Sequence, residues 1–151
     1  MKKTFHIMVA FVSQVVPNPS NIDYHSVDDS QEFTCLQTNE AAICQLQADE
    51  GGLAKIILIE TEKARDEVTR TTKDWQDWMT LYGCEKMSAV DFLKKQSVRK
   101  YPALAAVFED SHYAEDMGIE DSMRNIAAIA GRVRAFADCV RRKNPAAEVV
   151  L

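Results

Sequence analysis

Two nearly unbroken apolar runs constrain the fold of this chain of 151 residues more than any other feature of its sequence. The runs cover residues 5–12 and 53–60, and neither shows the strict alternation of a half-exposed strand. Such runs are typical of parallel strands that helices cover on both faces. The sequence therefore predicts an α/β domain with an open, mainly parallel sheet flanked by helices.

Local signals predict further elements around the second run. A short strand is predicted at 32–37, and Thr38-Asn39-Glu40 is a typical helix start before an Ala-rich segment that ends at Gly51-Gly52. This strand, this helix and the strand at 53–60 would form one βαβ unit. Helices are also predicted from Glu62 to about Tyr82 and from Ala89 to Gln96.

The C-terminal third is predicted to contain one long helix and one further strand. Residues 104–108 fit a strand or a helical turn, and the acidic stretch 110–116 is predicted to be a loop. Apolar spacing predicts a helix from Ile119, capped by Asp121 or Ser122, that ends at 141–143. Residues 148–151 look like the start of another buried strand, so 1–151 is expected to be one domain at the N-terminal part of a longer protein.

Charge and cysteine content narrow the classes of function. The net charge of −5 offers no basic surface for duplex nucleic acid. The four cysteines show no C-x-x-C spacing, which favours buried or semi-buried thiols in a reducing, cytoplasmic compartment. Although Met1-Lys2-Lys3 and the first run superficially resemble a signal peptide, His6 and Gln14 interrupt the run, and a first strand is the better interpretation. No stretch reaches the ~18 apolar residues of a membrane span.

Polar residues at the strand ends predict a binding edge. Ligands of open parallel sheets bind outside the carboxyl ends of the strands, where helix N-termini also lie. Alternatively, Thr38 and Asn39 only cap a helix and Ser13 only ends a strand. The residues expected at this edge are Ser13 and Gln14 after the first strand, Thr38 and Asn39 at the helix start, and Thr61 and Glu62 after the strand at 53–60.

Common catalytic and cofactor motifs are missing from the sequence. There is no Gly-x-Gly-x-x-Gly fingerprint or P-loop, and His6, His25 and His112 fit no metal-binding spacing, so neither a cofactor nor a metal is expected. His6 is predicted to be packed in its strand, and the other two histidines to lie in loops. Acidic pairs at 109–110 and 115–116 are better explained as solvated than as cation ligands. The aromatic residues Trp75, Trp78, Phe92 and Tyr101 fit a core or dimer-interface stripe better than base stacking.

Taken together, these segments resemble the CARF domain, the CRISPR-associated Rossmann fold of type III CRISPR accessory effectors. The resemblance covers most of the chain except about 63–118. It is carried by the first strand running into Ser13-Gln14-Val15-Val16-Pro17-Asn18-Pro19, by Leu36-Gln37-Thr38-Asn39-Glu40-Ala41, by Lys55-Ile56-Ile57-Leu58-Ile59, and by the helix from Ile119 to Lys143 that leads into the last strand.

The resemblance implies a Rossmann-like homodimer that binds a cyclic oligoadenylate across its interface and switches on an attached effector. By position it adds Asn18 to the six edge residues named above as ligand-binding candidates. Physically, Asn and Gln side chains can read adenine edges, so the net negative charge does not exclude such a ligand.

The sequence departs from the family in two respects, and it leaves two alternative functions open. The family's further glycine-containing ligand loop would fall beyond Leu151, and the Arg-to-His spacing of its common HEPN ribonuclease effector is missing here. One alternative is an enzyme that cleaves its own cyclic ligand, a reaction that needs mainly positioning and leaves little sequence signature. The other is a domain that only dimerises.

Overall fold

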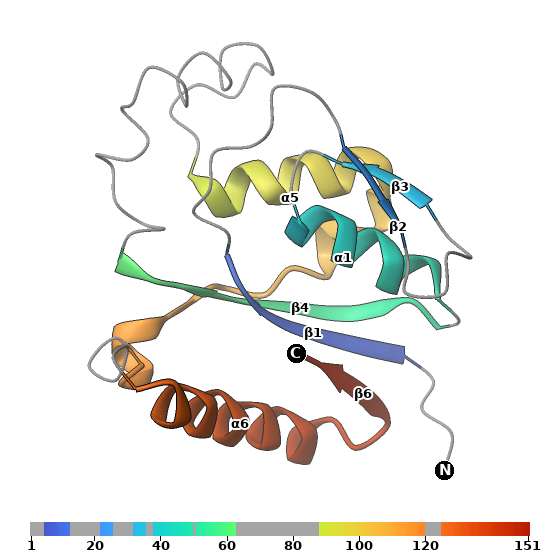
Figure 1. The fold of residues 1–151 in the computed structure, drawn as a ribbon. Helices are drawn as coiled ribbons and strands as arrows, with labels where there is room; N and C mark the ends of the chain where they lie inside the picture. Colours follow the sequence, from blue (N-terminus) through green and yellow to red (C-terminus); the bar gives the residue numbers. More distant parts are fainter. Residues whose placement is uncertain are drawn as a thin grey trace, which may run out of the picture.

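A four-stranded, fully parallel sheet forms the centre of the computed structural model (Figure 1). The structure describes residues 5–12, 22–25, 32–35, 38–49, 51–62, 88–119 and 125–151. The strand order is β5-β4-β1-β6. The strands are β1 (Phe5–Phe11), β4 (Leu53–Glu60), β5 (His112–Tyr113) and β6 (Ala147–Val150). The predicted open parallel sheet is confirmed, and its form is Rossmann-like.

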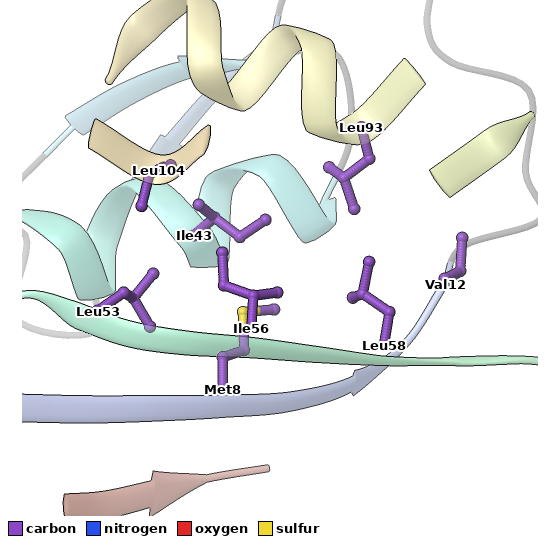
Figure 2. Close-up of a cluster of buried hydrophobic side chains, with 8 residues drawn as sticks. All are labelled: Met8, Val12, Ile43, Leu53, Ile56, Leu58, Leu93 and Leu104. Atoms are coloured by element: carbon purple, nitrogen blue, oxygen red, sulfur yellow. The ribbon is translucent and has the colours of Figure 1, made fainter. Parts of the chain in front are cut away.

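Helices cover both faces of the sheet, which explains the unbroken apolar runs. Figure 1 shows α1 (Thr38–Ala48) and α5 (Ala89–Lys100) on one face and α6 (Ile126–Lys143) on the other. Successive strand residues point to opposite faces, so both sets must be apolar. One core cluster contains Met8, Val12, Ile43, Leu53, Ile56, Leu58, Leu93 and Leu104 (Figure 2). The other contains Ile7, Val9, Ile57, Ile59, Ala114, Ile119, Val140 and Ala147.

The predicted strand at 32–37 does not join this sheet. Instead, β3 (Glu32–Cys35) pairs antiparallel with β2 (Ile22–His25) in a separate two-stranded sheet. The predicted βαβ unit was therefore wrong in its first member, and the crossover runs from β1 through α1 to β4. His25, expected in a loop, is the last residue of β2. A two-stranded insertion of four-residue strands leaves only a short apolar pattern, too short to show its partner from sequence.

Residues 101–119 form short elements that sequence patterns did not resolve. The predicted helix at 89–96 extends to Lys100, and the 3-10 helix η1 (Pro102–Ala106) follows it. The helical-turn alternative for 104–108 is therefore correct for 104–106, whereas Phe108 forms a parallel bridge with Ile56, as the strand alternative predicted. The segment 110–116 was wrongly predicted to be a loop. It contains β5, with His112, and the start of the 3-10 helix η2 (Ala114–Met117). These elements are too short for periodicity to reveal them.

The long C-terminal helix begins later than its apolar pattern predicted. Its N-cap is Asn125, whose side chain accepts a hydrogen bond from the Ala128 N–H at 3.2 Å. Ile119 is buried in the core, but it precedes the helix. Its burial, not a helical turn, accounts for its apolar character. The predicted caps at 121 and 122, and nearly all of the helix predicted from 62 to 82, lie outside the described residues.

Candidate functional site

The carboxyl ends of the parallel strands define the edge where a ligand-binding site is expected. Because β1, β4 and β5 run in the same direction, their carboxyl ends meet at one edge, at the left of Figure 1. Going from β1 to β4 to β5, the chain moves outward in one direction, and β6 lies on the opposite side of β1. The strand order therefore reverses at β1. In open α/β sheets, this switch point is where ligands bind.

The N-terminus of α1 lies at the carboxyl end of β1. The Asn39 side chain donates a hydrogen bond from Nδ2 to the main-chain carbonyl oxygen of Phe11 at 3.0 Å. Thr38 is exposed in the same first turn. The first-turn N–H groups of a helix have no partner within the helix, and with the helix dipole they favour an anion. The structure thus brings Thr38 and Asn39 to the predicted edge.

Two other predicted residues lie one strand away, and three lie outside the described residues. Thr61 is half-buried and Glu62 is exposed directly after β4. The Val12 N–H donates to the Ile59 carbonyl at 3.0 Å, which fixes the two strand ends in register. The structure does not describe Ser13, Gln14 or Asn18.

A hollow beside β4 and β5 has an acidic lining. It has a volume of about 490 Å³ and is lined by Glu60, Ser88, Val90, Asp91, Asp110, Ser111 and Tyr113. Three of these side chains are carboxylic acids and none is basic. Ser88, the N-cap of α5, accepts a hydrogen bond at its Oγ from the Asp91 N–H at 3.0 Å. Phosphate groups would be repelled from this part of the edge, which leaves the α1 side for an anion.

Exposed apolar side chains are found at the ends of several elements. Among the described residues, the large hydrophobic side chains that remain exposed are Phe11, Tyr113, Ile126 and Leu151. Phe11 and Tyr113 end β1 and β5, Leu151 follows β6, and Ile126 begins α6 with 84% of its surface exposed. Scattered exposed hydrophobics are ordinary, but Phe11, Tyr113 and Ile126 stand at the carboxyl ends of two strands and at the start of α6, and apolar side chains exposed there can serve as an interaction surface. We call these four residues the apolar rim.

A cluster of buried polar side chains connects the first turn of α1 to the end of α5. Glu40 is 1% exposed, and its Oε1 accepts a hydrogen bond from Lys100 Nζ at 2.7 Å. Lys100 Nζ also lies 3.5 Å from Cys35 Sγ. Cys35 and Cys44 are buried free thiols, and Tyr101 packs against them. We call Glu40, Lys100, Cys35, Cys44 and Tyr101 the buried polar cluster.

Burial changes the titration of this cluster. Desolvation and the neighbouring Cys35 raise the pKa of Cys44 to about 12. Desolvation and the Glu40 carboxylate raise the pKa of Cys35. Burial alone would lower the pKa of Lys100, but its hydrogen bond to Glu40 and the charge of that carboxylate raise it. Both thiols therefore stay protonated and Lys100 stays charged near neutral pH. Cys35 and Cys44 are buried thiols, as predicted.

The buried polar cluster could not be predicted from the sequence. A partial signal was present, because Glu40 shares a helix face with Ile43 and Cys44, at spacings of three and four residues. An acid on an apolar face requires a partner. Nothing in the sequence indicated that this partner is Lys100, which belongs to another helix.

The other described histidines, His6 and His112, do not belong to a metal centre among the described residues. His6 is largely buried, as predicted, and its Nε2 lies 4.0 Å from Asp49 Oδ2 and 3.8 Å from Glu148 Oε2. His112 packs edge to face against Phe136, with ring centroids 5.0 Å apart. In the part of the chain that the structure describes, no group of three or more His, Cys, Asp or Glu residues is arranged to hold a metal ion.

Comparisons with protein-family models, with curated proteins and with solved structures find no match to this chain. The described helices include none with both the length and the apolar character needed to cross a membrane. The structure thus shows a parallel α/β domain of Rossmann-like form.

Proposed function

We propose that this domain is a cytoplasmic sensor that binds a cyclic oligoadenylate across the carboxyl edges of a homodimer and regulates an attached effector in type III CRISPR defence. The observation that carries the proposal is the position of Asn39, hydrogen-bonded to the end of β1 in the first turn of α1. This arrangement places helix N–H groups and an amide side chain together at the switch point.

A cyclic oligoadenylate has chemical groups that suit both the N-terminus of α1 and the acidic hollow at this edge. Its phosphates suit the N-terminus of α1, and amide side chains can hydrogen-bond adenine edges. The acidic hollow repels phosphates but can accept hydrogen bonds from the exocyclic amino group of adenine. The apolar rim supports a second copy of the chain facing the same ligand.

Calorimetric titration tests the proposal directly. Cyclic tetra-adenylate and cyclic hexa-adenylate are titrated into the folded protein, with linear oligoadenylate as the control ligand. We expect one ring to bind per dimer. No heat from either ring, with a protein shown to be folded, would refute the proposal. Chromatography of the ligand after the titration separates a sensor, which returns the ring intact, from an enzyme that cleaves it.

Replacing Asn39 with Ala tests the proposed site. We expect ring affinity to fall at least about tenfold, while the free energy of unfolding falls by only about 1 kcal/mol, because one exposed hydrogen bond is lost. Asn144→Ala is the matched control, since Asn144 Nδ2 donates to the Val140 carbonyl at 2.9 Å at the C-terminus of α6. Unchanged affinity in Asn39→Ala, or an equal loss in the control, would remove Asn39 from the site.

A further inference from the structure

The buried polar cluster links three elements behind the candidate site. Lys100 is the last residue of α5, Glu40 lies in the first turn of α1, and Cys35 ends β3. A single ammonium group contacts both of the others, at 2.7 Å and 3.5 Å. Glu40 follows Asn39 directly in the sequence. The side chain that follows the candidate ligand residue Asn39 is therefore hydrogen-bonded to the last residue of α5.

A buried ion pair of this kind is a poor source of net stability. Removing a carboxylate from water costs several kcal/mol, and the attraction of its partner only roughly compensates for this cost. Lys100 keeps 35% of its side chain exposed, whereas Glu40 keeps 1%. Replacing both members of such a pair with well-packed hydrophobic side chains of similar volume is often neutral for stability or stabilising. What the charged pair adds is a short hydrogen bond with one defined geometry.

We infer that Lys100, through its ion pair with Glu40, is a positioning residue that fixes the first turn of α1 and thereby holds Asn39 in place for the ligand. The inference deepens the proposed function and rests on it only for the role of Asn39 in binding. Lys100 itself lies at the end of α5 and acts through Glu40.

The expected signature is a local loosening without global unfolding. In the double variant Glu40→Met with Lys100→Met, hydrogen exchange should speed up about tenfold or more at residues 42–45, whose N–H groups donate to the carbonyls of the first turn of α1, while α6 exchanges as before. The melting temperature should stay within about 4 °C of the wild type. Ring affinity should fall about tenfold. The single variant Lys100→Arg retains a partner for Glu40, so it should keep both the slow exchange and the ring affinity of the wild type.

A second ion pair of the same length serves as the matched control. Arg141 Nη1 lies 2.7 Å from Asp138 Oδ1 on the exposed side of α6. The double variant Asp138→Asn with Arg141→Met should change neither exchange at 42–45 nor affinity, because exposed pairs contribute little.

Each outcome decides the inference. Unchanged exchange at 42–45 in the Glu40/Lys100 double variant overturns it, as does exchange that rises uniformly through the molecule with a large fall in melting temperature. Unchanged ring affinity, when the wild type binds the ring, also overturns it. If the wild type binds neither ring, the proposed function fails, and the exchange measurement alone still decides whether the pair positions α1.

Discussion

At the scale of single residues, the buried polar cluster makes folding sensitive to alkaline pH. The pKa of Cys44 is raised from its ordinary value of 9.0 to about 12. Below pH 9 the thiol is protonated in both the folded and the unfolded chain. Between pH 9 and 12 the unfolded chain loses this proton while the folded protein keeps it, so stability decreases as pH rises. The raised pKa of Lys100 acts in the same direction above 10.5.

We predict that the free energy of unfolding falls steadily above pH 9, with Cys44 contributing up to about 4 kcal/mol by pH 12. In Cys44→Ala this contribution is removed, and the decline above pH 9 should be shallower. Urea unfolding at a series of pH values, in the presence of a reductant, measures both profiles. Parallel declines in the wild type and the variant would contradict the assignment to Cys44.

Replacing glycine with alanine should have opposite effects on stability at Gly118 and at Gly131. Gly118 ends η2 at φ +69°, and an added Cβ would meet Arg132 Nη1 at 2.8 Å. Gly131 lies within α6, and an added Cβ would meet nothing within 4 Å. We expect Gly118→Ala to lower the free energy of unfolding by about 1–2 kcal/mol and Gly131→Ala to raise it by about 0.5–1 kcal/mol. Thermal and urea unfolding compare the two variants, and equal effects would be inconsistent with this account.

At the scale of elements, the strands that the sequence predicted correctly are those with long apolar patterns. β1 and β4 were predicted within one residue of their observed ends, because helices on both faces of the sheet require nearly unbroken apolar runs in these strands. β5 could not be predicted, since two residues show no period. The start of α6 was misplaced because Ile119 is apolar for a tertiary reason. The position of Asn39 followed from topology, whereas the partner of Glu40 is 60 residues away and left no local signal.

Charge placed inside β4 should abolish folding. Ile57 is 7% exposed and is aligned with Val9 of β1. We expect Ile57→Asp to cost more than about 3 kcal/mol, because it buries an unpaired carboxylate. Ala54→Asp is the control on the same strand, where the side chain is exposed, and should cost less than about 1 kcal/mol. Circular dichroism with urea unfolding separates the two. A cooperative Ile57→Asp variant with near wild-type stability would mean that this strand is misplaced.

At the scale of the whole molecule, the apolar rim predicts self-association. Ile126 is the most exposed member of the rim and is the first residue of α6. The helix dipole stabilises an acidic side chain at this position. We therefore expect Ile126→Glu to weaken the dimer at least about tenfold while leaving the melting temperature within a few degrees of the wild type. Light scattering after size-exclusion chromatography, across a concentration series, measures the change. A dimer of unchanged strength would place the interface elsewhere.

The strand order also determines when the sheet can form during synthesis. β1 is flanked by β4 and by β6, and the register pairs Phe5 with Ala147. One edge of the central strand therefore stays open until almost all of the intervening chain has left the ribosome. Contacts between such distant residues form slowly, and an unpaired strand edge in a partly folded chain is prone to aggregation. The yield of folded protein should depend on how well the nascent chain is protected before β6 emerges.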